Sequence, residues 1–141
     1  MRDGRHLLSV RVYYEDTDFS GVVYHASYLR FMERGRTEFL RQIGVDHRAM
    51  FEGETAVAFV VRAMQIEFLK AARMDDVLTI ETAVSEVRGA SIMMRQQVGR
   101  GDETLVTAEL KIAMISGGRA QRLPPSIRDA LTRAAGAENP R

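Results

Sequence analysis

Residues 15–44, EDTDFSGVVYHASYLRFMERGRTEFLRQIG, join a short acidic loop to one long amphipathic helix. Apolar or small residues recur there at the spacing of a single helix face: Tyr28, Met32, Gly35, Phe39 and Ile43. We therefore expect a helix over residues 27–43. Gly35 lowers helix stability within this stripe, so it predicts close backbone packing, and Gly44 suits the left-handed position that ends a helix.

Alternating apolar and polar residues predict strands on both sides of this helix. The expected strands cover residues 8–14, 56–69, 77–87, 90–99 and 104–115. A short helix is expected over residues 126–135, followed by a frayed tail over 136–141. This order predicts one α+β domain over residues 1–141, with a meander as the simplest topology for its antiparallel sheet. The sheet would leave exposed edges, so we expect at least a dimer.

Composition narrows the classes of function. The 141 residues contain no cysteine, which excludes disulfides, thiolate zinc sites and a cysteine nucleophile, and suits a reducing cytoplasm. The net charge of +1 gives no general attraction to nucleic acid or to an anionic membrane. No signal peptide or membrane-spanning run is visible, so we expect a cytoplasmic protein without membrane insertion.

The acidic loop permits three interpretations. The spacing of Asp16, Asp18 and Ser20 resembles the start of a calcium-binding EF-hand loop, but Ser27 stands where a bidentate glutamate is needed. An Asp-x-Asp phosphotransferase would need a parallel α/β domain, which a chain with one long helix cannot build. In the third interpretation, the carboxylates form turns and complement the helix dipole, and we favour this role for Glu15 and Asp16.

Asp18 stands apart once the longer stretch YYEDTDFSGVVYHASYLRFMERGRTEFL is considered. This stretch, together with FVVRAMQIEFLKAARMDDVLTIET, VRGAS and RLPPSIRDAL, resembles the 4-hydroxybenzoyl-CoA thioesterase-like branch of the hotdog superfamily. It is most similar to the acyl-CoA thioesterases associated with the Tol-Pal system. The resemblance implies a five- or six-stranded antiparallel sheet around the central helix, and a dimer with a continuous sheet, often paired into a homotetramer. It also implies an acyl-CoA substrate, no metal or other cofactor, and CoA bound along the subunit interface.

The resemblance assigns roles to five residues. Asp18 matches the catalytic aspartate of the family, and His25 matches an active-site histidine of the Tol-Pal branch. Tyr14 stands where that branch places a tyrosine beside the site. Arg88 and Ser91 occupy a turn that resembles the nucleotide-contacting region, although the corresponding turn of the 4-hydroxybenzoyl enzymes is more basic. These assignments imply catalysis by Asp18, His25 and Tyr14, with substrate binding by the turn.

The residue chemistry fits thioester hydrolysis without the family name. The reaction needs a group that attacks the carbonyl or activates water, and a donor for the charge on the carbonyl oxygen. An ionised Asp18 could act in either way, and a backbone amide near His25 at the helix start could be the donor.

Other interpretations remain open at this point. His25 could be a helix cap, Tyr14 could be a core residue, and we take His6 and His47 as structural or surface residues. The rival function is a non-catalytic acyl-CoA or acyl-carrier binding module of the same fold. A dehydratase is a weaker rival, because its arrangement of acid and histidine is absent from this helix.

Overall fold

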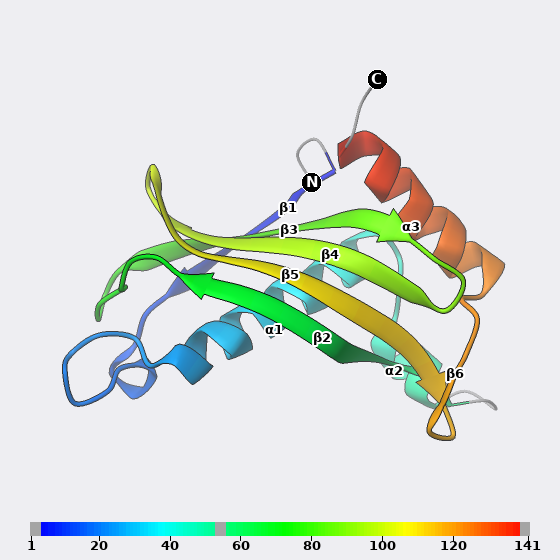
Figure 1. The fold of residues 1–141 in the computed structure, drawn as a ribbon, viewed down its shortest axis with the longest axis horizontal. Coiled ribbons are helices and arrows are strands. Elements are labelled where there is room, and N and C mark those ends of the chain that lie inside the picture. Colours follow the sequence, from blue (N-terminus) through cyan, green and yellow to red (C-terminus); the bar gives the residue numbers. More distant parts are fainter. Residues whose placement is uncertain (1–3, 53–55, 139–141) are drawn as a thin grey trace.

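The computed structural model describes residues 4–52 and 56–138 (Figure 1). In chain order, its elements are β1 (His6–Arg11), the 3-10 helix η1 (Tyr14–Asp16), α1 (His25–Gln42), α2 (His47–Glu52), β2 (Ala58–Phe68), β3 (Val77–Val87), β4 (Ser91–Arg100), β5 (Glu103–Ser116), β6 (Arg119–Ala120) and α3 (Pro125–Glu138). These elements form an α+β structure, in which a curled antiparallel sheet lies against the long helix α1. The predicted fold class and hotdog architecture are therefore confirmed.

The order of strands differs from a simple meander. The sheet runs β1-β3-β4-β5-β2, and β6 adds a short pairing to β5. The meander is correct for β3 to β5 but wrong for β2, which pairs with β5 at the far edge of the sheet. The physical reason is the crossing made by α1 and α2 (Figure 1), which lies between β1 and β2 in the chain. β2 begins after that crossing, beyond the reach of β1.

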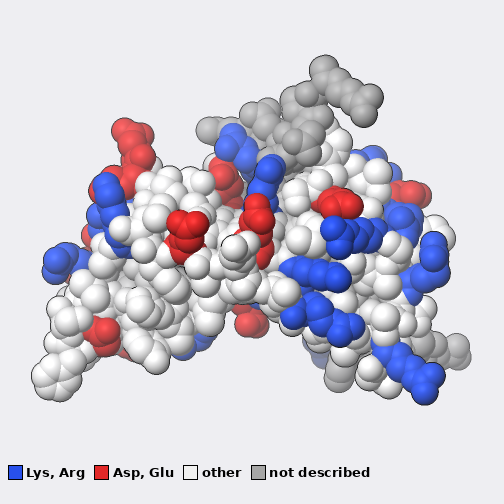
Figure 2. Space-filling model, in the orientation of Figure 1, with Lys and Arg blue, Asp and Glu red and all other residues white. Residues whose placement is uncertain are grey.

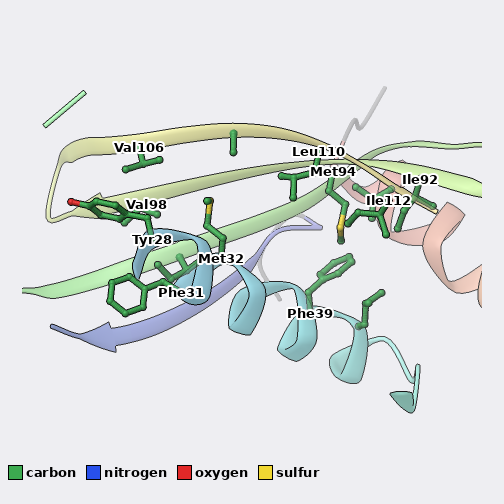
Figure 3. Packing of buried hydrophobic residues seen from close by; sticks show 14 of the residues in the cluster. Tyr28, Phe31, Met32, Phe39, Ile92, Met94, Val98, Val106, Leu110 and Ile112 are labelled. Carbon is green, nitrogen blue, oxygen red and sulfur yellow. The ribbon is translucent and has the colours of Figure 1, made fainter. Parts of the chain in front are cut away.

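The apolar face of α1 packs on the sheet, as its periodicity predicts. Tyr28, Phe31, Met32 and Phe39 are all buried and point from the helix toward the strands (Figure 3). Gly35 lies at the closest approach, since a Cβ atom there would stand 2.7 Å from Cγ2 of Ile80 in β3. The predicted close backbone packing is confirmed, and it explains why a larger residue would not fit.

One buried polar group fastens α1 to the sheet beside that glycine. The side chain of Gln96 in β4 donates from Nε2 to the carbonyl oxygen of Met32, 2.8 Å away, and to the hydroxyl of Thr82, 2.9 Å away. Its Oε1 atom accepts a bond from the guanidinium of Arg36 at 3.0 Å. A buried amide with this many partners fixes the rotation of α1 on the sheet, and therefore the direction in which the helix start points.

Several predicted boundaries shift in the structure. β1 ends at Arg11, short of Tyr14, because the backbone of Val12 exchanges hydrogen bonds with residues 75–76 and the chain then turns into η1. α1 begins at His25, two residues early, and Gly44 takes the expected left-handed conformation with φ +93°. Neither α2 nor β6 was predicted from the sequence pattern. Residues 136–138 belong to α3 where a frayed tail was predicted, and the rest of that tail lies outside the described residues.

No helix among the described residues has both the length and the apolar character needed to cross a lipid bilayer.

Candidate active site

The acidic loop, residues 17–24, is held between η1 and α1 by backbone pairing. Its two ends pair through an isolated bridge between Thr17 and Val23, and the amide of Val23 also donates to the carbonyl of Ala72 at 2.8 Å. A second bridge joins Val22 to Arg73. The partner residues belong to the segment 69–76 that links β2 to β3. The acidic loop is thus held against the segment 69–76 by backbone pairing, and α1 begins directly after the loop.

Asp18 is exposed on this loop, with its two carboxylate oxygens in different surroundings. Its Oδ1 atom accepts hydrogen bonds from the amide of Ser20 at 2.9 Å and from the Ser20 hydroxyl at 2.6 Å. The hydroxyl bond is the main cause that lowers the pKa of Asp18, followed by the amide bond, with a smaller share from the nearby charge on His25. Within the described residues, no other residue donates to Oδ2. Asp18 therefore presents an ionised carboxylate with one oxygen free.

His25 begins α1, and its imidazole lies against an aromatic ring from another element. The ring centroid of Phe68, the last residue of β2, is 4.3 Å from that of His25, with 30° between the planes. In the part of the chain that the structure describes, neither ring nitrogen of His25 has a hydrogen-bond partner. The ring is held by stacking and its edge stays open.

The first amides of α1 provide a second kind of donor. The amide of Tyr24 donates to the carbonyl of Asp16 at 2.9 Å, and that of Ser27 donates to Tyr24 at 2.8 Å. The amides of His25 and Ala26 lie between them and find no acceptor among residues 4–52 and 56–138. Free amides at a helix start carry partial positive charge and favour an anion or a developing oxyanion.

Two cavities open at this end of the molecule. One has a volume of about 310 Å³ and is lined by Tyr14, Thr17, Asp18, Phe19, Gly21 and Met74. The other has a volume of about 220 Å³ and is lined by Val22, Val23, His25, Tyr28, Phe68, Leu69, Lys70 and Ala71. Asp18 and Tyr14 thus share one cavity, while His25 faces the next. A larger hollow of about 500 Å³, lined by Arg5 and by residues of β2, β3, β4 and β5 such as Glu81, Arg95 and Glu109, includes none of the predicted site residues.

Tyr14 is not part of the core. It belongs to η1 and is 81% exposed, so the interpretation as a core aromatic is wrong. Tyr14 lines the cavity that holds Asp18, and its carbonyl oxygen accepts a bond from the hydroxyl of Thr17 at 2.8 Å. The neighbouring Tyr13, Phe19 and Tyr24 are also exposed, so aromatic surface surrounds the acidic loop.

Arg88 and Ser91 lie far from Asp18 within one chain. They flank the turn between β3 and β4, whereas the acidic loop lies near Val77 at the opposite end of β3, in the lower left of Figure 1. An 11-residue strand such as β3 covers roughly 35 Å. The guanidinium of Arg88 is paired with Glu86 at 3.1 Å. The structure does not bring the turn and Asp18 together in a single chain.

Two further arginines, Arg122 and Arg128, lie near that turn and were not predicted from the sequence. The guanidinium of Arg122, from the segment before α3, lies 3.6 Å from the position that a Cβ atom would take at Gly89. Arg128 donates from Nη2 to the carbonyls of Arg88 and Gly89, both at 3.0 Å. Figure 2 shows Lys and Arg side chains gathered at this end of the molecule.

Comparison with known proteins now identifies the family. The model of the thioesterase-like superfamily matches residues 12–134. The chain belongs to that superfamily. The acyl-CoA thioesterase YbgC of Haemophilus influenzae is 46% identical over 119 residues, which cover 84% of this chain and 87% of that protein.

Solved structures of thioesterases agree with this assignment. A probable thioesterase from Bartonella henselae is 47% identical, covers 85% of this chain and 99% of its own, and superposes with a TM-score of 0.83. A 4-hydroxybenzoyl CoA thioesterase mutant complexed with 4-hydroxybenzoyl CoA has a TM-score of 0.82 at 22% identity, over 90% of this chain and 98% of its own, and shows the fold alone. The predicted resemblance to the thioesterases is confirmed. Among the described residues of this thioesterase-like chain, no group of three or more His, Asp or Glu side chains could hold a metal ion.

Proposed function

We propose that this thioesterase-like chain hydrolyses an acyl-CoA to a free acid and CoA, with Asp18 as the nucleophile or general base. One observation carries the proposal: an exposed, ionised carboxylate with a free oxygen lies seven residues before the unpaired amides that begin α1. These are the two groups that thioester hydrolysis needs. The relatives named acyl-CoA thioesterase YbgC support the same substrate class.

Two routes for Asp18 remain open. In the first, its free oxygen attacks the thioester carbonyl, CoA leaves as the thiolate, and water then hydrolyses the resulting anhydride. In the second, the carboxylate takes a proton from a water molecule that attacks the carbonyl. In both, the amide of His25 or Ala26 donates a hydrogen bond to the carbonyl oxygen as it gains negative charge.

The proposed roles of His25 and Tyr14 follow from the polar groups of their side chains. The open edge of the His25 ring can orient water or supply a proton, because imidazole exchanges protons near neutral pH. The phenol of Tyr14 can orient the thioester in the cavity that it shares with Asp18. The CoA thiolate is itself a good leaving group, so no strong general acid is required.

We place the nucleotide part of CoA between two copies of the chain. β2 is an edge strand, so its outer side is open for pairing with β2 of a second copy. Antiparallel pairing of two such strands reverses the second copy end for end. The turn with Arg88 and Ser91 of one copy would then lie at the same end of the assembly as Asp18 of the other. A dimer, or a dimer of dimers, therefore belongs to the proposal, as does a cytoplasmic location.

The experiment is a hydrolysis assay on the purified protein with short, long and aromatic acyl-CoAs, in the presence of a chelator. We expect free CoA to be released from at least one of them. If the protein binds acyl-CoA and leaves every thioester intact, the non-catalytic binding module is the correct function. Activity that appears only after a divalent metal is added would contradict the role of Asp18.

Light scattering tests the assembly separately. We expect a dimer or tetramer at micromolar concentration, because pairing at β2 satisfies the open backbone groups of an 11-residue edge strand. A stable monomer that hydrolyses acyl-CoA would remove the interfacial CoA site and leave the role of Asp18 intact.

A further inference from the structure

The proposed mechanism gives no role to Phe68, although its ring lies against that of His25. Phe68 ends β2 and is 41% exposed. Its ring stacks on His25 at 4.3 Å and also contacts the ring of Tyr28 at 5.8 Å, with 51° between those planes. Phe68 therefore links the end of an edge strand to the first turn of α1.

The support beneath Phe68 is well fixed. The next two amides, those of Leu69 and Lys70, both donate to the carbonyl of Leu105, at 2.8 Å and 3.1 Å. The hydroxyl of Tyr28, a residue that is only 2% exposed, accepts a hydrogen bond from the amide of Ala72 at 2.9 Å. Because the segment on both sides of the stack is held by hydrogen bonds, the Phe68 ring can act as a fixed surface for a neighbour.

His25 lacks the usual means of holding an imidazole in place. A functional histidine is commonly oriented by a hydrogen bond to one ring nitrogen from a carboxylate or a carbonyl. Within the described residues, His25 has no such bond, and its ring stacks on that of Phe68. Face-on stacking covers the carbon face and leaves both nitrogens at the edge available for proton exchange or for a bond to water.

We propose that Phe68 is a positioning residue that sets the plane of the His25 imidazole through aromatic stacking. The inference rests on the proposed function, in which His25 acts on water or on the thioester. It predicts that the ring of Phe68 affects kcat by orienting His25 and not by direct contact with the substrate.

The first test is a double-mutant cycle on the steady-state kinetics, with Phe68→Leu and His25→Gln made singly and together. Loss of the stack should lower kcat by about 2- to 10-fold, the scale of one aromatic pair, with a smaller change in KM. In the His25→Gln background, Phe68→Leu should cost little more, because the group that it positions is gone. Phe68→Tyr keeps the stack and should retain kcat. An equal loss in both backgrounds would overturn the inference.

The second test reads the imidazole directly and does not depend on turnover. The chain has three histidines, so the His25→Gln variant assigns the His25 ring resonances by their disappearance from the NMR spectrum. The ring current of Phe68 should displace these resonances, and Phe68→Leu should move them toward the values of an unstacked histidine. A His25 spectrum that stays unchanged in Phe68→Leu would overturn the inference. If His25→Gln leaves kcat unchanged, the proposed role of His25 fails, and the spectrum still decides whether Phe68 holds the ring.

Phe59→Leu is the matched control. Phe59 lies on the same strand, opposite Met114, and packs against the core at the other end of β2. The same aromatic-to-aliphatic change there should lower Tm and leave both the His25 resonances and kcat in place. A shift of the His25 resonances as large as that from Phe68→Leu would mean that the spectrum reports general loosening of β2, which contradicts positioning by Phe68.

Discussion

Asp16 and Asp18 are two carboxylates only two residues apart, one at the end of η1 and the other in the loop that follows it, and the structure places them in opposite surroundings. Asp16 is 8% exposed, and its Oδ2 atom accepts a hydrogen bond from the amide of Tyr13 at 2.8 Å. The carbonyl oxygen of Asp16 also accepts bonds from the amide of Tyr24 at 2.9 Å and from the hydroxyl of Ser27 at 3.1 Å. Asp18 is exposed and bonded only through one oxygen, to Ser20.

The difference shows that burial and partners separate a structural carboxylate from a candidate catalytic one. Asp16 ties η1 to the start of α1, so its acceptor atoms are used inside the protein. Asp18 keeps one oxygen for a substrate or for water. The predicted structural role of Asp16 agrees with these contacts, whereas the chemical role of Asp18 stays a prediction that the variants below can test.

The largest expected effect is on turnover, from Asp18→Asn. Asparagine keeps the size of the side chain and can still accept the bonds from Ser20, so the loss should report charge and basicity. We expect kcat to fall roughly 10²-fold or more, with a smaller change in substrate binding and a nearly unchanged Tm. A variant that hydrolyses acyl-CoA at the rate of the original protein would remove Asp18 from the mechanism.

The next effect is on stability, from Asp16→Ala. This change leaves the amide of Tyr13 without its acceptor in a part-buried place, and we expect a loss of about 1–3 kcal/mol in the free energy of unfolding. Asp16→Asn restores an acceptor and should keep kcat within about tenfold of the original. Denaturant unfolding measures the first and the CoA-release assay the second. If Asp16→Asn and Asp18→Asn caused equal, mild losses of kcat, the contrast between the two carboxylates would collapse.

The sequence predicts local structure in this protein better than long-range pairing. The face of α1 and the role of Gly35 follow from spacing alone, because a helix repeats its own geometry. The position of β2 does not, because pairing with β5 depends on where the crossing helices deliver the chain. The alternation of residues 8–14 predicts a strand as far as Tyr14, but β1 ends at Arg11 and Tyr14 begins η1, and no residue pattern there distinguishes a strand end from a single 3-10 turn.

The residues of the candidate site show the same difference between what a local motif predicts and what depends on contacts between distant elements. Asp18 and His25 can be selected from a continuous motif, and Ser20 has a local signal, since a residue two places after an aspartate often donates to its carboxylate. Phe68 lies 43 residues beyond His25 in the chain, and its stacking depends on where the end of β2 lies relative to the start of α1. Its sequence context is that of any apolar strand residue. Contacts between distant elements therefore had to come from the structure.

The smallest expected effect is a shift of the pH profile, from Ser20→Ala. The Ser20 hydroxyl is the main cause of the lowered pKa of Asp18, so removing it should raise that pKa. Because the mechanism needs the ionised carboxylate, activity is lost as pH falls through the pKa of Asp18. The acid limb of the kcat profile should therefore move to higher pH in Ser20→Ala, while the plateau near neutral pH changes little. Thr17→Val is the control, since the Thr17 hydroxyl donates to the carbonyl of Tyr14 and should leave the acid limb in place. An acid limb that stays fixed in Ser20→Ala would mean that a group other than Asp18 governs the loss of activity at low pH. The ionised carboxylate of Asp18 would then give no reason to assign it, in contrast to Asp16, a catalytic role.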